Sequence, residues 1–267
     1  MNILGLIAGN GVFPIEVAAA ARRQGIRVIA VAHLNETKPE LEAEVDELTW
    51  IKVGELERII DTFKRGGVEQ AAMAGGISRA RLQDSFAPDA RAMRMLSRIG
   101  RFSDDAVLRG VAAEVEAEGI PMIDPVPLIP DALARDGVIA GPQPSETQLK
   151  DLNLAFTVAR QIGQFDIGQT VAVRDGIVAA VEAVEGTDAA LRRAAQAMGK
   201  RLVVAKTAKP GQDLRFDRPA IGPATIELLK EIGAAVLGIE AGMTLILERE
   251  RTIDGARASG LTVYGHA

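Results

Sequence analysis

The sequence predicts an α/β protein: a Rossmann-like N-terminal domain, whose parallel sheet carries helices on both faces, and a mixed α/β C-terminal domain. Short apolar runs alternate with helix-like stretches through about the first 130 residues, which is the pattern of βαβ units. That alternation is lost beyond a stretch rich in glycine and proline. We therefore expect domains over residues 1–135 and 147–267, joined by a linker over 136–146.

The apolar runs of the first half have the length of buried strands, and each is followed by turn residues or by an amphipathic helix. Pro14 stands in the first turn of one expected helix, where its missing N–H costs little. A helix cap is expected at Ser103 to Asp105. The expected strands cover residues 3–8, 27–32, 70–74 and 121–124, and the expected helices cover residues 13–23, 56–65 and 103–118.

The second half does not repeat this winding. Asp175-Gly176 separates two apolar runs and predicts a β-hairpin. The other elements predict a domain that mixes hairpin and crossover connections. Strands are expected over residues 169–174, 177–181, 202–205 and 243–247 and near 235, and helices over 146–164, 187–198 and 223–232.

Composition limits the chemistry that the chain can perform. It contains no cysteine, which excludes thiol catalysis, disulfides and cysteine-based zinc sites. The two histidines, His33 and His266, are too few for a multi-histidine metal site. The net charge of −5 argues against nucleic acid as a partner, because no basic excess is available to neutralise phosphates. Carboxylates, lysines, arginines and backbone amides must therefore carry the chemistry.

The sequence has no basic segment before its first apolar run, and no apolar stretch approaches the ~20 residues of a membrane span. These features predict a cytoplasmic protein.

Glycine-rich turns follow two of the expected N-terminal strands. Gly9-Asn10-Gly11 lies between a strand and a helix, where backbone N–H groups and the helix dipole suit a phosphate. Gly76 and Arg79 follow a later strand, and the carboxyl ends of parallel strands share one edge of the sheet. The alternative for both places is a tight turn without a ligand. The spacing of the glycines matches neither a Walker loop nor a dinucleotide fingerprint. The second expected strand ends at His33 without an acidic residue that could bind a ribose.

The second half concentrates charge at strand ends. Asp213, Arg215 and Asp217 alternate with apolar residues, so an extended segment would place all three on one face of a sheet. Two acids around a guanidinium can hold a divalent metal ion together with a phosphate. Lys206 and Lys209 flank the end of the preceding strand.

A second acidic group lies at the end of another apolar strand. Glu182 and Glu185 precede an expected helix for which Thr187 or Asp188 would be the N-cap. Capping explains the last two residues but not the two glutamates. We therefore expect a functional site that includes both charged groups.

At these residues the chain resembles the UDP-2,3-diacylglucosamine pyrophosphatase family of lipid A biosynthesis, the type unrelated to calcineurin-like phosphoesterases. The resemblance covers nearly the whole chain. It rests on five motifs: Gly5-Leu-Ile-Ala-Gly-x-Gly-x-Phe-Pro14, Ile167-Gly-Gln-Thr-Val171, Ala180-Val-Glu-Ala-Val-Glu-Gly-Thr-Asp188, Lys206-x2-Lys-Pro-x-Gln-Asp-Leu-Arg-Phe-Asp217 with Pro219, and Gly222-Pro-x-Thr225.

The resemblance implies Mg²⁺-assisted hydrolysis of UDP-2,3-diacylglucosamine to UMP and 2,3-diacylglucosamine 1-phosphate, with water attacking the β-phosphorus. It also implies two domains that close on the substrate, and a homodimer. The lipid product is amphiphilic, so peripheral contact with the inner membrane is expected without a spanning helix.

The family's functional residues carry over onto matching positions of this chain. Asp217 and Asp213 would bind the metal ion or activate water, and Glu185 and Asp188 are further candidate metal ligands. Phosphate binding is expected from Lys206, Lys209 and Arg215, and other substrate contacts from Gly9, Asn10, Gly11, Val12, Phe13, Gly76, Arg79, Gln169, Gly186 and Thr187.

Two other classes of function remain open on the residues alone. The first is a nucleotide-sugar transferase or oxidoreductase that uses the N-terminal domain as a Rossmann module, against which the incomplete glycine fingerprint counts. The second is a non-catalytic sensor that binds a nucleotide or lipid without turnover.

Overall fold

The computed structural model describes residues 2–78, 86–99 and 103–267, which form two compact units. Unit 1 comprises Met1–Pro130 together with Asp213–Asp217, and unit 2 comprises Asp131–Gln212 and Arg218–Ala267. The chain therefore enters unit 1 a second time, for five residues that we expected in the C-terminal domain. Arg79, an expected substrate contact, lies outside the described residues.

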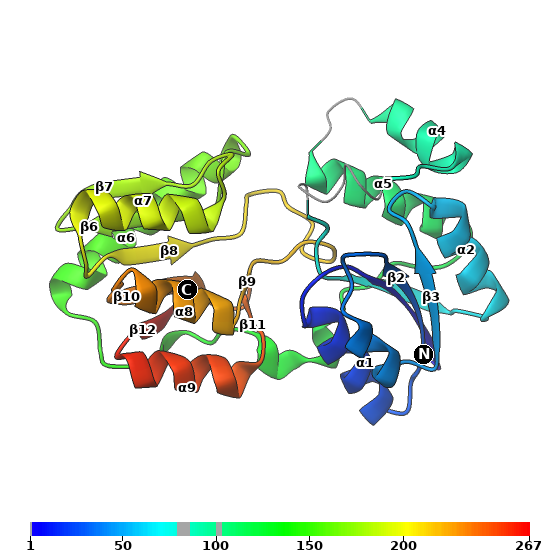
Figure 1. Ribbon diagram of the computed structural model, residues 1–267, viewed down its shortest axis with the longest axis horizontal. Helices are drawn as coiled ribbons and strands as arrows, with labels where there is room; N and C mark the ends of the chain where they lie inside the picture. Colours follow the sequence, from blue (N-terminus) through cyan, green and yellow to red (C-terminus); the bar gives the residue numbers. More distant parts are fainter. Residues whose placement is uncertain (1, 79–85, 100–102) are drawn as a thin grey trace. The chain divides into compact units, whose positions relative to one another are not determined.

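The described strands of unit 1 form a parallel sheet in the order β3-β2-β1-β4. Its strands are β1 (Ile3–Ala8), β2 (Arg27–His33), β3 (Glu47–Ile51) and β4 (Gln70–Ala74) (Figure 1). The predictions for β1, β2 and β4 are confirmed. We did not predict β3, because Glu47 and Thr49 interrupt its apolar run and the strand lies at the edge of the sheet.

Helices cover both faces of this sheet, as predicted. They are α1 (Phe13–Arg23), α2 (Leu56–Arg65), α4 (Ala90–Arg98) and α5 (Asp104–Glu116), with 3-10 turns η1 (Pro39–Glu44) and η2 (Val126–Leu128). One sheet face packs against α2, α4 and α5 through a continuous apolar core, while α1 packs against β1, β2 and β4. The strand expected at 121–124 is wrong, because only Met122 pairs there, as a single bridge to Ala71 of β4.

Unit 2 is built on a mixed sheet in the order β5-β12-β10-β8-β6-β7. The strands β8 (Val203–Lys206), β10 (Val236–Glu240) and β12 (Thr262–His266) are parallel, while β6 (Thr170–Arg174) and β5 (Gly137–Ala140) pair antiparallel with their neighbours. The predicted mixed character is confirmed. We expected a linker over 136–146, and in the structure this range contains β5, which pairs with β12.

The predicted hairpin joins β6 to β7 (Ile177–Val181). Asp175 and Gly176 both have positive φ, 51° and 78°, as a type I′ turn requires. The buried carboxylate of Asp151 accepts both turn amides, at 2.9 Å from Asp175 N and 2.7 Å from Gly176 N. A local turn signal and a tertiary contact therefore stabilise the same conformation.

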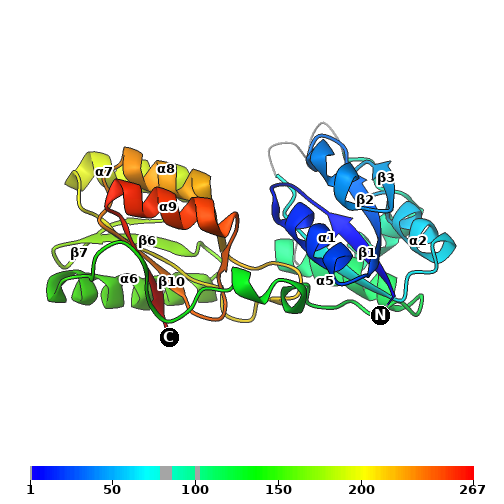
Figure 2. The same ribbon diagram turned by 90° about the horizontal axis from the view of Figure 1, so that it is seen from below.

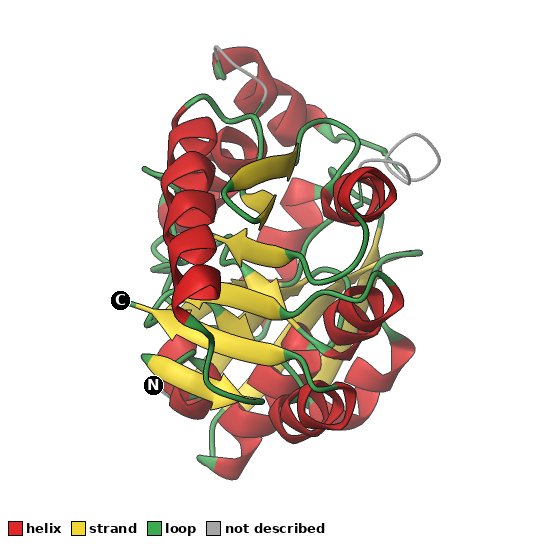
Figure 3. Cartoon of the chain, turned by 90° about the vertical axis from the view of Figure 1, so that its left-hand side faces the viewer, coloured by secondary structure: helices red, strands yellow, loops and turns green. Residues whose placement is uncertain are grey.

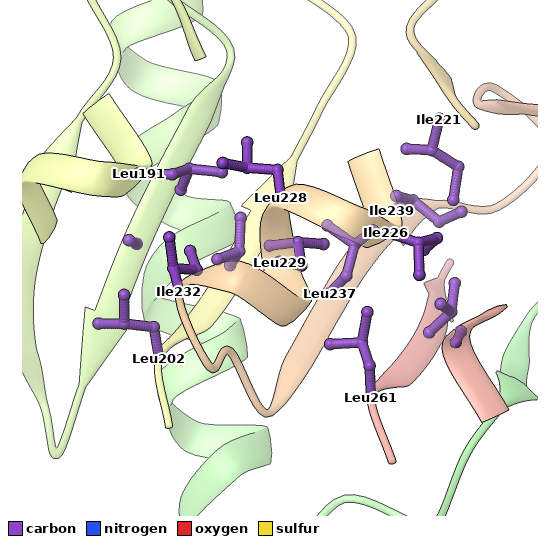
Figure 4. Close-up of a cluster of buried hydrophobic side chains, with 14 of the residues drawn as sticks. Leu191, Leu202, Ile221, Ile226, Leu228, Leu229, Ile232, Leu237, Ile239 and Leu261 are labelled. Atoms are coloured by element: carbon purple, nitrogen blue, oxygen red, sulfur yellow. The ribbon is translucent and has the colours of Figure 1, made fainter. Parts of the chain in front are cut away.

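Helices also cover both faces of the unit 2 sheet (Figures 2 and 3). α6 (Glu146–Gln164) packs on one face, and it begins with a capping box between Ser145 and Gln148. The other face carries α7 (Thr187–Met198), α8 (Pro223–Glu231) and α9 (Arg249–Ser259), whose apolar core with the sheet is drawn in Figure 4. The remaining elements are η3 (Pro130–Ala132) and the strand pair β9 (Ala220–Ile221) and β11 (Leu245–Ile246).

Candidate active site

The segment Asp213–Asp217 is a helical turn, so the extended conformation that would place its three charged side chains on one face is not present. The amides of Phe216 and Asp217 donate to the carbonyl oxygen of Asp213, at 3.0 and 3.2 Å. The Asp213 carboxylate also accepts the amide of Arg215 at 3.1 Å. This local side-chain bond gives the backbone an alternative to a sheet ladder and favours a turn. The shared face that we expected for the two acids and the arginine on a strand therefore does not form.

Within the turn, Arg215 folds back onto Asp213. Its Nε lies 3.1 Å from Asp213 Oδ1, and the second contact, between an Nη nitrogen and Oδ2, is 2.9 Å. The hydrogen bonds from Arg215 lower the pKa of Asp213, which is therefore ionised at neutral pH. Arg215 also donates to the Met122 carbonyl at 3.2 Å and lies over the Phe216 ring. In this structure both residues thus have structural partners, and their predicted phosphate and metal roles stay predictions.

Unit 1 holds this turn through a residue to which we had given only a capping role. Asp105 Oδ1 accepts the amide of Asp213 at 3.0 Å, and Oδ2 accepts Nε of Arg109 at 2.7 Å. Phe216 is buried in the core of unit 1. The N-cap of α5 is Ser103, so the Asp105 side chain serves the turn instead. The turn ends at the exposed Asp217, whose backbone position is fixed by these contacts.

We expect Asp105→Ala to lower the free energy of unfolding of unit 1 by about 1–3 kcal/mol, because it removes the acceptor of the Asp213 amide and one of the two carboxylates that Arg109 contacts. Asp105→Asn is the matched control, since it keeps the side-chain size and an oxygen that can accept the Asp213 amide. Urea unfolding, followed by the fluorescence of Trp50, measures the free energy of unfolding of each variant. Trp50 is the only tryptophan and lies in β3, so it reports on unit 1. Equal effects of the two variants would contradict the role of Asp105.

The two lysines predicted to bind phosphate lie at one end of the unit 2 sheet. Lys206 ends β8 and donates from Nζ to the Ala220 carbonyl at 2.9 Å. Lys209 Nζ lies 2.6 Å from Oδ1 of Asp166. Both cations are thus held by unit 2 itself, and their role toward a phosphate stays a prediction.

The loop after β8 is fixed by Glu240, which we did not predict. This side chain ends β10 and is largely buried. Its Oε2 accepts the Ala208 amide at 2.7 Å, and its Oε1 accepts Nε of Arg160 at 3.0 Å. An acid at the carboxyl end of an apolar strand was the available sequence signal. Beside the same loop, Gln169 Oε1 is buried and has no hydrogen-bond partner within the described part of the chain.

Both glutamates before α7 have partners within unit 2, which we did not expect. Glu182 accepts the Thr187 hydroxyl at 2.8 Å, and Glu185 pairs with Arg193 at 2.7 Å, which lowers the pKa of Glu185. The N-cap of α7 is Gly186, with φ 81°, so our expectation of Thr187 or Asp188 as the cap is wrong. A glycine reaches this φ without the steric cost that threonine or aspartate would carry.

The two glycine turns of unit 1 lie side by side, as the shared sheet edge predicted. The Gly9 amide donates to the Ala74 carbonyl and the Asn10 amide to the Gly76 carbonyl, each at 2.8 Å. Two amides that we expected to meet a phosphate therefore bind the neighbouring turn. Gly11 has φ 82° and leads to Val12, the N-cap of α1, and Phe13, its first residue.

We expect Gly9→Ala to destabilise unit 1 by about 3 kcal/mol, because its Cβ would lie inside the contact distance of the backbone of Gly75 and Gly76. Gly11→Ala is the control. It places a residue at positive φ but meets no atom within 4 Å, so we expect about 1 kcal/mol. The same Trp50 fluorescence experiment compares them. If Gly9→Ala costs no more than Gly11→Ala, the close approach of the two turns is not required.

An acid that lies three residues beyond the end of the second strand joins these turns. Glu36 is 5% exposed, and its Oε2 accepts Asn10 Nδ2 at 3.3 Å and the Ser78 amide at 3.2 Å. Its Oε1 is buried without a hydrogen-bond partner among the described residues. The strand itself ends at His33 without an acid, as we expected, and the chain returns to the sheet edge three residues later.

Comparison with known proteins identifies the family. The LpxI N-terminal domain matches residues 3–132 and the LpxI C-terminal domain matches residues 135–264. The UDP-2,3-diacylglucosamine pyrophosphatase LpxI of Caulobacter vibrioides is 36% identical over 277 aligned positions, which cover 99% of this chain and 98% of that protein. The chain belongs to the LpxI family. The resemblance inferred from its motifs is thereby confirmed.

Solved structures of other proteins add nothing to this assignment. A biotin carboxylase domain of Hydrogenobacter thermophilus 2-oxoglutarate carboxylase aligns with a TM-score of 0.28 and 17% identity, over 75% of this LpxI-family chain and 43% of that chain. Leucoanthocyanidin reductase of Vitis vinifera aligns with a TM-score of 0.28 and 18% identity, over 45% of this chain and 48% of that chain. At such scores neither likeness carries an argument about the LpxI family.

The acids predicted as metal ligands differ in their surroundings. Asp213 and Glu185 each pair with an arginine, and Asp188 is strongly exposed with Arg192 at 4.0 Å. Within the described ranges, no three acidic or histidine side chains are grouped so that they alone could hold a metal ion. Mg²⁺ often binds through one or two carboxylates, waters and substrate phosphates, a mode that the exposed carboxylate of Asp217 fits. None of the helices in the described part of this LpxI-family chain is long and apolar enough to cross a membrane.

Proposed function

We propose that this chain hydrolyses the pyrophosphate of UDP-2,3-diacylglucosamine to UMP and 2,3-diacylglucosamine 1-phosphate, a step of lipid A biosynthesis. Membership of the LpxI family and the name of the Caulobacter vibrioides relative support the proposal. The structural observation that carries it is the anchored turn at Asp213, which presents the exposed carboxylate of Asp217 at a fixed place on unit 1.

The chain's charged residues suit this reaction. A pyrophosphate needs its non-bridging oxygens neutralised and a water positioned for attack. Lys206 and Lys209 would neutralise the phosphates, and Asp217 would either hold a metal ion or take the proton of the attacking water. Bound Mg²⁺ would withdraw charge from the phosphoryl oxygens. Attack on the β-phosphorus breaks its bond to the bridging oxygen, which leaves with UMP.

The test is ³¹P NMR of the purified chain with UDP-2,3-diacylglucosamine in ¹⁸O-labelled water. We expect UMP and 2,3-diacylglucosamine 1-phosphate, with the isotope shift on the phosphorus of the lipid product. A label on UMP would instead indicate attack on the α-phosphorus. Binding of the substrate without turnover would contradict the proposed hydrolysis and favour the non-catalytic sensor.

We also propose that the chain works as a cytoplasmic homodimer with peripheral membrane contact. Analytical ultracentrifugation tests the first part, since the molar mass that it gives for a dimer is twice that of one 28.3 kDa chain. Flotation with vesicles that contain the lipid product tests the second. A monomer at all concentrations, or a chain that never floats, would contradict the corresponding part.

A further inference from the structure

Unit 1 contains an apolar pocket that the proposed reaction does not yet use. It lies among the carboxyl ends of β1, β2 and β4, the start of α2, and helices α4 and α5. The cavity volume is about 140 Å³. A well-packed core leaves few voids larger than a water molecule, so a cavity of this size has room for an apolar group.

The lining of the pocket is almost entirely hydrocarbon. Met73 comes from β4, Ala92, Met95 and Leu96 from α4, and Val111 from α5. No charged side chain is among the described residues that line it. A water inside such a space would find few hydrogen-bond partners, so an apolar occupant is favoured.

His33, a titratable residue that lines the pocket, is also uncharged. Nδ1 of His33 donates to the Ala8 carbonyl at 2.9 Å, and burial lowers the pKa of His33. The imidazole is therefore neutral at neutral pH and does not introduce a charge into the pocket.

An ion pair joins the two helices that cover the pocket, and one end of the pocket reaches the glycine turns. Arg91 of α4 pairs with Glu114 of α5 at 2.7 Å, which ties the two covering helices together. Gly9 and Gly75, from the two hydrogen-bonded turns, line the same pocket. The site thus runs from the partly exposed backbone of Gly75 at a sheet edge into a hydrocarbon interior, which suits an amphiphilic molecule.

We propose that this pocket binds a fatty acyl chain of the substrate, an inference that rests on the proposed function. The diacylglucosamine part carries long hydrocarbon chains that must leave water when the enzyme binds it. Each buried methylene contributes about 0.8 kcal/mol, or about a fourfold gain in affinity. The dimensions of the pocket therefore set which chain length is preferred.

The experiment compares kcat/KM for UDP-2,3-diacylglucosamines of graded chain length in matched variants. Ala92→Phe narrows the pocket, and Met93→Phe adds the same group one residue away, where the α4 side chain is exposed. We expect Ala92→Phe to reduce kcat/KM for long chains at least tenfold relative to short ones, and Met93→Phe to leave that ratio unchanged.

A second variant gives a result that misfolding cannot imitate. Leu96→Ala widens the pocket and should shift the preference toward longer chains, while the control Met93→Ala should not. Unchanged chain-length ratios in both Ala92→Phe and Leu96→Ala would overturn the proposal.

A direct binding measurement separates this proposal from the reaction itself. The fluorescent fatty acid cis-parinaric acid is titrated into the full chain and its variants, and no turnover is needed. Weaker binding in Ala92→Phe than in Met93→Phe supports the acyl pocket even if no substrate is hydrolysed, which would overturn only the proposed function. Equal affinity of the two variants for cis-parinaric acid would overturn the proposal that this pocket binds an acyl chain.

Discussion

Asp217→Ala should reduce turnover of UDP-2,3-diacylglucosamine by three orders of magnitude or more while the chain stays folded. A thousandfold loss corresponds to about 4 kcal/mol of transition-state stabilisation, the size expected when a metal-holding or proton-accepting carboxylate is removed. Stability should change little, because Asp217 is exposed at the end of its turn. Steady-state kinetics and Trp50 fluorescence in urea provide the two measurements.

The neighbouring acid of the same turn supplies the contrast. Asp213→Ala removes the acceptor of Arg215 and should lower both activity and the stability of unit 1. Asp254→Ala, an exposed acid paired with Arg257 in α9, should change neither. Near-normal turnover in Asp217→Ala would remove this residue from the proposed chemistry, whatever the other two variants do.

Removal of divalent metal should lower activity as strongly as Asp217→Ala. The reason is that negative charge develops on the bridging oxygen as its bond to the β-phosphorus breaks, and bound Mg²⁺ would stabilise that charge. We expect turnover below detection after exhaustive chelation and full recovery on addition of Mg²⁺. The measurement is product formation followed by ³¹P NMR, in metal-depleted buffer and after titration with Mg²⁺.

The control for chelation is the unfolding curve, which should not shift, because no group of acids within the described residues is placed to hold a metal for stability. Full activity in the depleted protein would refute the role of Mg²⁺. In Asp217→Ala, added Mg²⁺ should fail to restore the rate.

Much of the architecture could be predicted because its signals are local. The helices α1, α2, α6 and α7 have the bounds that their periodicity indicated, and the Asp-Gly turn of the β6–β7 hairpin has the expected positive φ angles. The strands and α-helices missed entirely among the described residues were β3, β5, β9, β12, α4 and α9. In β3 polar residues interrupt the apolar run, and β5 lies in a Gly- and Pro-rich stretch that looks like a linker. A pairing partner distant in sequence makes each of these a strand.

By itself the sequence determined the family, the α/β class and the kind of chemistry, because motifs, periodicity and the absence of cysteine are properties of the chain alone. The tertiary structure decided what each charged residue does. Alternation in the five residues from Asp213 permits a strand or a turn, and Asp105 with the core around Phe216 selects the turn. Glu36 and Glu240 acquire their roles in the same way, because a buried carboxylate must find donors, and only the folded chain brings those donors to it.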